Sequence, residues 1–219
     1  MYEDTTYCDG TETTVIADMK CSIPMSILRA STYGLDYGDS VVAKVQAHNS
    51  RGWSAFSASA TTVATIQTEP TQMSAPTRGS STSSSQIEVS WTALTTAAET
   101  GGASIISYHL QWDAGTTTTW YDVVGLSPSY TSTSVILSTS IVPGTTYYFR
   151  VRAENAQGWG SYSSSGSITA AQAPYQVTGV STSIDSTTGG VTITWSAPSS
   201  GYATIDKYEI NIEDSTTAW

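Results

Sequence analysis

Hydrophobic and polar residues alternate along several short stretches of the chain. Between residues 87 and 91, apolar side chains occupy every second position, at Ile87, Val89 and Trp91. The same period recurs further on, at Tyr147, Phe149, Val151 and Ala153. A period of two places these side chains on one face of a β-strand. The pattern therefore predicts strands with one buried face, and an all-β fold.

These alternating stretches are parts of internal repeats. The segment VVAKVQAHNSRGWSAFS, which starts at Val41, matches YYFRVRAENAQGWGSYS, which starts at Tyr147, at an offset of 106 positions. IEVSWTA, from Ile87, matches VTITWSA, from Val191, at an offset of 104. At an offset of 100, the pair Tyr108 and Leu110 matches Tyr208 and Ile210. A period near 100 residues with alternating strands is typical of tandem β-sandwiches.

The repeated residues resemble those of fibronectin type III domains. The resemblance rests on Trp91 of an early strand, Tyr108 of the next, and PGTTYYFRVRAEN followed by a glycine-containing hairpin. It implies a complete seven-strand sandwich over residues 68–173. It also implies a tyrosine corner, in which the hydroxyl of Tyr147 bonds back to the preceding backbone. The resemblance and the alternation together predict these core residues: Trp91, Tyr108, Leu110, Phe149, Val151, Trp195, Tyr208 and Ile210.

The two remaining segments each match only part of such a domain. Residues 1–67 match the later strands, roughly C′ to G, and residues 174–219 match the early strands, A to C. Neither part can close a sandwich by itself, because each leaves an apolar face and strand edges uncovered. The parts are complementary, since Trp120-Tyr121-Asp122 resembles Trp219-Met1-Tyr2-Glu3, read from the end of the sequence into its beginning.

We therefore expect the sequence to be one period of a head-to-tail array. In the interpretation we favour, it is a window of a long covalent array of two-domain units. In the alternative, each chain completes the split domain of its neighbour, as in strand addition. Either arrangement produces a filament, because a head-to-tail contact that does not close is open-ended. Closure within one molecule is sterically harder, because the complete domain lies between the two parts.

The net charge of −10 argues against nucleic acid and against an anionic membrane surface as partners. No apolar run approaches the roughly 20 residues that span a bilayer, so membrane insertion is not expected. The first twenty residues are acidic and have no apolar core of a signal peptide. Met1 is then an internal methionine of a longer chain, or the protein is cytosolic.

Cys8 and Cys21 are the two cysteines of the sequence. They are either two buried free thiols or a disulfide closing a loop of about 14 residues, which would stabilise the fold by about 3 kcal/mol. We favour the disulfide, because YCDG and KCSIP look like turns at strand ends. A disulfide indicates an oxidising compartment, so the location is extracellular or the cell surface. The cysteine-containing copy resembles repeats of long extracellular arrays of single-celled eukaryotes, such as ciliates.

The sequence contains no recognisable catalytic motif, and we expect neither an enzyme nor a cofactor. His48 and His109 lie between inward-facing residues of their strands, so alternation predicts that both are exposed. One cluster of acidic residues is a candidate calcium site: Glu213, Asp214, Glu3, Asp4 and Asp9. It lacks the loop of a calcium-binding motif, and we favour a solvated acidic surface.

Trp53 and Trp159 each follow a hairpin glycine in the two copies. They either pack at the edge of the sandwich or against the adjoining domain, which we favour, or serve as binding anchors. About a third of the residues are Ser or Thr. Part of this excess is β-propensity, but one run is a candidate site for O-glycans: Thr116, Thr117, Thr118 and Thr119.

The sequence thus favours a structural protein of an extracellular or cell-surface filament, whose partner is itself, head to tail. The alternative is an adhesion or binding module that displays loops to a carbohydrate or protein ligand.

Overall fold

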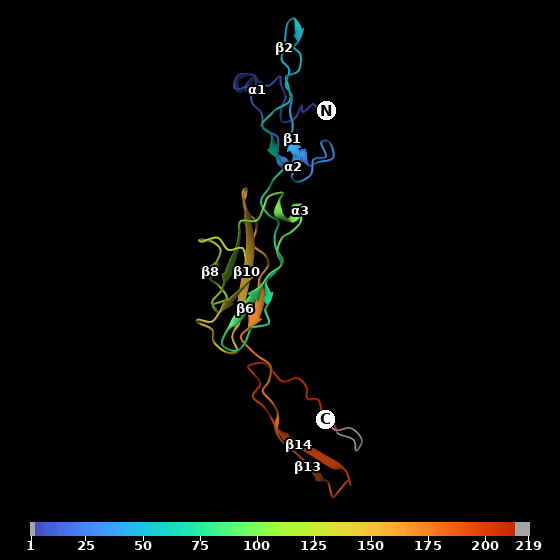
Figure 1. Cartoon of the computed structure of the whole chain (residues 1–219), viewed down its shortest axis with the longest axis vertical. Helices are drawn as coiled ribbons and strands as arrows, with labels where there is room; N and C mark the ends of the chain where they lie inside the picture. Colours follow the sequence, from blue (N-terminus) through green and yellow to red (C-terminus); the bar gives the residue numbers. More distant parts are fainter. Residues whose placement is uncertain (1–2, 213–219) are drawn as a thin grey trace.

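The computed structural model describes residues 3–212. The chain is long and narrow, with a central sandwich between an N-terminal segment at one end and a C-terminal segment at the other (Figure 1). The predicted continuity from Trp219 into Met1 and Tyr2 lies outside the described residues, as do Glu213 and Asp214.

Two antiparallel sheets form the central sandwich. The larger sheet has the order β11-β10-β7-β8, with β12 also paired to β10. Its strands are β7 (Ser107–Trp112), β8 (Tyr121–Val124), β10 (Thr146–Asn155), β11 (Gly158–Trp159) and β12 (Gly166–Thr169). The smaller sheet is β5-β6-β9, with bounds Thr77–Arg78, Ile87–Ser90 and Ser134–Leu137. The short helix α3 (Ala97–Thr100) lies in the connection from β6 to β7.

The inner faces of these two sheets form the hydrophobic core. Five residues that the sequence assigns to it are buried there: Trp91, Tyr108, Leu110, Phe149 and Val151. The hydroxyl of Tyr147 donates to the Ser140 carbonyl at 3.3 Å and accepts from the Val142 N–H at 2.7 Å. It thereby ties the start of β10 to the loop before it, as a tyrosine corner does.

The N-terminal segment has two short helices followed by hairpin strands. The elements are α1 (Thr13–Asp18), α2 (Met25–Leu28), β1 (Ser40–Val41), β2 (His48–Asn49), β3 (Gly52–Trp53) and β4 (Ala64–Thr65). The strands expected before Ser40 are not formed in the described residues. In the central domain the corresponding strands, β8 and β9, pair with β7 and β6. The N-terminal segment has no equivalents of β7 and β6, so its backbone bonds locally instead.

The disulfide predicted from the sequence is confirmed. Cys8 and Cys21 are bonded across a separation of 13 residues, with their Cα atoms 5.2 Å apart. The bond closes the loop that contains α1.

The C-terminal segment contains one hairpin and an extended stretch. The hairpin strands are β13 (Thr178–Ile184) and β14 (Val191–Ser196). Residues 204–212 follow without forming a strand.

The junctions on either side of the central domain are built alike. The Thr68 N–H donates to the Gly101 carbonyl at 2.9 Å, and the Gln172 N–H donates to the Gly201 carbonyl at 2.9 Å. A Cβ at Gly101 would lie 2.1 Å from the Thr68 carbonyl oxygen. Only glycine permits this approach, so the loop after α3 is packed directly on the connecting chain.

Candidate functional site

The N-terminal hairpin is built like the β10–β11 hairpin of the central domain. Ser57 Oγ accepts a hydrogen bond from the Val45 N–H at 3.1 Å. At the matching position, Ser163 Oγ accepts from the Val151 N–H at 3.0 Å. Further pairs of matching features are Asn49 with Asn155, each accepting from the N–H two residues on, and Gly52 with Gly158, each at positive φ. This hairpin therefore has the local geometry of the β10–β11 hairpin in the complete sandwich.

The C-terminal segment repeats the other part of the central domain. In the β13–β14 hairpin Thr182 lies opposite Ile193, the register in which Arg78 lies opposite Val89 in β5–β6. The rings of Trp195 and Tyr208 are 5.2 Å apart. Their counterparts in the core of the central domain are 6.2 Å apart. Trp195 and Tyr208 of this segment are thus already in contact although no second sheet covers them.

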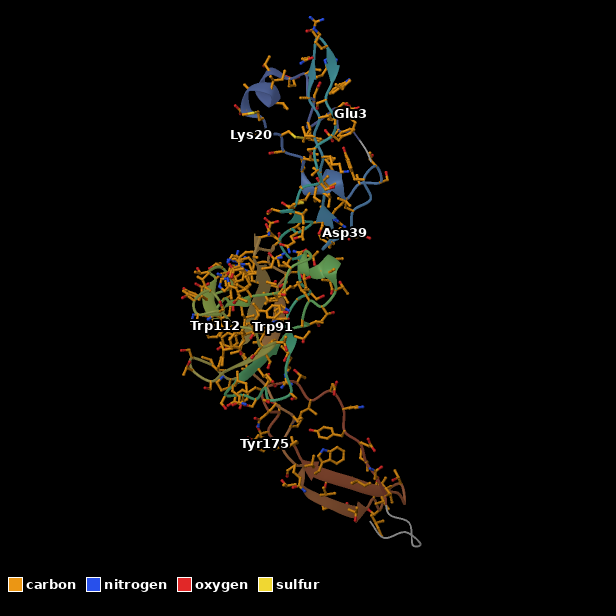
Figure 2. All side chains as sticks on the ribbon, turned by 45° about the horizontal axis from the view of Figure 1, so that its top comes forward. Glu3, Lys20, Asp39, Trp91, Trp112 and Tyr175 are labelled. Atoms are coloured by element: carbon orange, nitrogen blue, oxygen red, sulfur yellow. A yellow bond between two sulfur atoms is a disulfide. The ribbon has the colours of Figure 1, made fainter. Side chains whose placement is uncertain are left out.

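Solvent exposure separates the two segments from the central domain. Val45 is 71% exposed, whereas its counterpart Val151 is fully buried. Tyr208 and Ile210 are 40% and 49% exposed, and Trp195 is half-buried. The assignment of Trp195, Tyr208 and Ile210 to a core must therefore be corrected for this chain. None of the three belongs to the buried cluster, because neither segment supplies the opposing sheet. Figure 2 shows the contrast, with side chains crowded around Trp91 and Trp112 and spread apart in both end segments.

The strand edges of the two segments are open as well. Val45 and Ala47 use their backbone groups within the hairpin, towards Ser57 and Ser54. Lys44 and Gln46 direct theirs to the other edge, where no backbone partner lies within residues 3–212. No backbone hydrogen bond in that range reaches residues 204–212 either. The corresponding edges of β10 and β7 pair with each other in the central domain.

His109 is buried, so the prediction that it is exposed is wrong. Its side chain does face away from the core, as alternation indicates, but it is only 1% exposed. The rings of Trp159 and Tyr162 cover it. Nε2 donates to Asp122 Oδ1 at 2.8 Å, and Nδ1 accepts from the Tyr162 hydroxyl at 2.9 Å. Burial lowers the pKa of His109 despite the neighbouring carboxylate, so the imidazole is neutral.

Arginine and aromatic side chains alternate over this outer face of the sheet. The Arg150 guanidinium lies 4.3 Å from the Trp120 ring centroid and 4.2 Å from that of Tyr162. The Arg152 guanidinium lies 4.4 Å from Tyr162 and 4.7 Å from Trp159. Cation–π contacts of this kind join β10 to Trp159 of β11, to Tyr162 in the segment after it, and to Trp120 just before β8. Trp159 is therefore a packing residue of its own sheet, and not a free anchor.

Trp53 has a different environment from Trp159. Lys44 and Gln46 stand where the central domain has its two arginines, and Trp53 is 63% exposed. Its ring contacts that of His48 at 4.8 Å. Both line an open pocket of about 300 Å³ at the tip of the hairpin, at the far end from the central domain (Figure 1).

The remaining candidate residues that the structure describes form no site. Residues 116–119 lie in an exposed turn, and O-glycosylation there stays a prediction. Asp4 accepts from the Tyr33 hydroxyl and from three backbone N–H groups, which lowers its pKa. Within residues 3–212, no three His, Cys, Asp or Glu residues are grouped so as to hold a metal ion. No helix in that range is long and apolar enough to cross a membrane.

The fold and the comparisons agree on the central domain. Residues 69–169 match the family model of the fibronectin type III domain. The molecule is all-β, with this domain at its centre. Domains of this type commonly serve as structural or binding modules and are typically not enzymes.

Three solved structures illustrate the similarity. Titin domains match with 24% identity and a TM-score of 0.37, over 48% of this chain and 32% of that one. The 6th fibronectin type III domain of a human fibronectin type III domain containing protein matches with 21% identity and a TM-score of 0.40. The match covers 51% of this chain and 95% of that one. The FN1–FN3 domains of chicken CNTN1 match with 19% identity and a TM-score of 0.40. The match covers 71% of this chain and 53% of that one.

The chain spans about a third of the titin fragment. Similarity at this level carries nothing about ligands or partners. The comparison with curated proteins found no match. The resemblance to arrays of single-celled eukaryotes stays an expectation from the sequence.

Proposed function

We propose that this chain is a structural module of an extracellular or cell-surface filament, in which neighbouring units join end to end. Residues 174–212 of one unit and residues 3–66 of the next together make one fibronectin type III sandwich. Complete and shared sandwiches then alternate along the filament. The units are copies of this chain or successive periods of a longer polypeptide, and the contact is the same in both cases.

One observation carries the proposal: the two end segments hold hairpins that match different parts of the central sandwich, and their apolar residues are exposed. Val191 and Ile210, which correspond to fully buried residues of the central domain, are 68% and 49% exposed. The two segments supply different strands, so they are complementary and do not compete. They also lie at opposite ends of the molecule, which suits a head-to-tail contact and makes closure within one chain difficult (Figure 1).

The extracellular location is supported by the Cys8–Cys21 disulfide and by the type of domain. Disulfides persist in oxidising compartments and are rare in the cytosol. Exposed apolar residues such as Val45, Val191 and Ile210 also make an isolated unit prone to aggregation. This favours a state in which another unit covers them.

Electron microscopy of the purified full-length chain tests the proposal. We expect filaments one molecule wide, and we expect Ile210→Asp to abolish them, because the carboxylate would be buried without a partner. Thr192→Asp is the control. Thr192 is exposed on the outer face of β14, next to the inner-face residue Val191, and its counterpart in the complete domain is the acidic Glu88, so this variant should still form filaments.

Filaments that survive Ile210→Asp, or that are lost equally in Thr192→Asp, would contradict the proposed contact. A chain that forms no filaments at any concentration would contradict the filament role.

The pocket beside Trp53 favours one second candidate function, a binding module for carbohydrate. An exposed indole with neighbouring polar groups is suited to stacking on a sugar ring. Titration with a panel of soluble glycans, followed by tryptophan fluorescence, tests this role. Quenching that is lost in Trp53→Ala but kept in Trp159→Phe would support it, and an unchanged signal across the panel would overturn it.

A further inference from the structure

We infer the strand register by which a second copy of this chain docks on the N-terminal hairpin. Residues 207–211 of one copy add antiparallel to residues 44–48 of the other, with Ile210 opposite Val45 and Tyr208 opposite Ala47. This inference rests on the proposed function, since it specifies the contact that joins neighbouring units.

The register comes from the complete domain of the same chain. There β10 pairs with β7 so that Val151 lies opposite Leu110 and Ala153 opposite Tyr108. The sequence repeats transfer β10 to the N-terminal hairpin by 106 positions and β7 to the C-terminal stretch by 100. The first pair becomes Val45 with Ile210, and the second becomes Ala47 with Tyr208. In both copies an aromatic residue faces an alanine, which leaves room for its ring.

The backbone of the hairpin independently selects the same alternation. Val45 and Ala47 bond to the other strand of the hairpin, so only the even-numbered residues offer groups to a new strand. Gln46 then bonds to Glu209, as Arg152 pairs with His109 in the complete domain. Val45 and Ile210 become a non-hydrogen-bonded pair, whose Cα atoms approach to about 4.5 Å.

The exposed side chains exclude a register shifted by one residue. Such a shift would move Tyr208 and Ile210 to the outer face of the sheet. Tyr208 already packs on Trp195, which belongs to the inner face of its own segment. On the outer face the inferred register places Lys44 opposite Asn211 and diagonal to Glu209, so no like charges are opposed.

Paired cysteine substitutions in the full chain test the register. The in-register variants are Val45→Cys with Ile210→Cys, and Ala47→Cys with Tyr208→Cys. The out-of-register variants exchange the partners: Val45→Cys with Tyr208→Cys, and Ala47→Cys with Ile210→Cys. Each substitution occurs once in each class, so its own effect on folding cancels. The readout is the ladder of covalent multimers on a denaturing, non-reducing gel after mild oxidation.

We expect the in-register pairs to cross-link at least tenfold faster than the exchanged pairs. Diagonal Cα atoms lie about 7–8 Å apart, at or beyond the reach of a disulfide. Faster cross-linking of the exchanged pairs would overturn the register. Equal rates in all four variants would overturn it too, since they would indicate unspecific contact.

Zero-length carbodiimide cross-linking of the unmodified chain gives a second reading if the cysteine variants assemble poorly. We expect an intermolecular link between Lys44 and Glu209, identified by mass spectrometry. Filaments without this link would overturn the register and leave the filament role standing. The absence of both filaments and links would instead contradict the proposed function itself.

Discussion

The buried His109 shows what alternation along a strand does and does not predict. Alternation correctly placed His109 on the outer face of the sheet, but it does not predict which side chains cover that face. The sequence did contain a sign of this cover: two arginines at alternate positions, Arg150 and Arg152, followed by Trp159 and Tyr162. Their stacking on His109 depends on side chains from separate segments of the chain, which the pattern of one strand does not contain.

The neutral His109 makes the stability of the central domain pH-dependent. Burial lowers its pKa, so the unfolded chain takes up a proton that the folded domain does not. The free energy of unfolding is therefore fully present above about pH 6.5, the ordinary histidine pKa, and decreases as the pH falls below it. Urea denaturation between pH 7.5 and about 5 measures the slope.

In His109→Gln we expect a flatter slope over the same pH range, because the titrating group is gone. The facing charged groups do not mimic the effect: Asp122 has a pKa lowered by hydrogen bonds from Gln111 and His109 and titrates in more acid solution. An identical slope in the variant would show that His109 is not the source.

Tyr147→Phe removes the hydroxyl that holds Ser140 and Val142. We expect the free energy of unfolding to decrease by about 1–2 kcal/mol, since one hydrogen bond is lost and one N–H is left unpaired. Equilibrium denaturation measures the change. Tyr148→Phe is the control, because that side chain is 38% exposed and its hydroxyl bonds to no residue of the described chain. Equal losses in the two variants would contradict the role of the corner.

At the scale of elements, strands formed only where the chain supplies their partners. The hairpins at 40–65 and 178–196 are local, so sequence periodicity predicted them well. The strands expected before Ser40 need neighbours that lie in the C-terminal segment, and two short helices formed instead. Periodicity describes which face a strand buries, but pairing decides whether a strand exists.

The Cys8–Cys21 disulfide stabilises the N-terminal segment separately from the central domain. Replacing both cysteines by serine should lower the free energy of unfolding of the shared sandwich by about 3 kcal/mol, the loop-closure value for a loop of this length. Calorimetry of the filament should show an earlier first transition, with the transition of residues 69–169 unchanged. A shift of both transitions together would contradict this independence.

The junction at Gly101 is sensitive to any side chain. Gly101→Ala places a Cβ 2.1 Å from the Thr68 carbonyl oxygen, so the loop must leave the connecting chain. We expect faster amide exchange at Thr68 and Thr71, measured by mass spectrometry of the full chain. Gly115→Ala is the control, with a similar positive φ but its nearest contact at 3.4 Å. Equal exchange in the two variants would mean that the close packing is unimportant.

At the scale of the whole molecule, the end segments are the parts that the sequence described least directly. The repeat offsets predicted their strands and which residues share a face. They did not predict that Tyr208 and Ile210 are exposed, because burial depends on a second sheet that neither end segment supplies. In the complete domain at the centre, the two sheets cover each other, and neither end segment has such a second sheet. The larger sheet of the complete domain gives the register of the contact that we infer between units.

Sedimentation velocity of the full-length chain over a range of concentrations is the most direct test of end-to-end assembly. End-to-end assembly predicts an open-ended series of species that grows with concentration, because every assembly still has one uncovered end segment at each end. It also predicts that the Ile210→Asp variant stays monomeric while the Thr192→Asp variant assembles as the unmodified chain does. A single species of 23.1 kDa at every concentration would contradict end-to-end assembly.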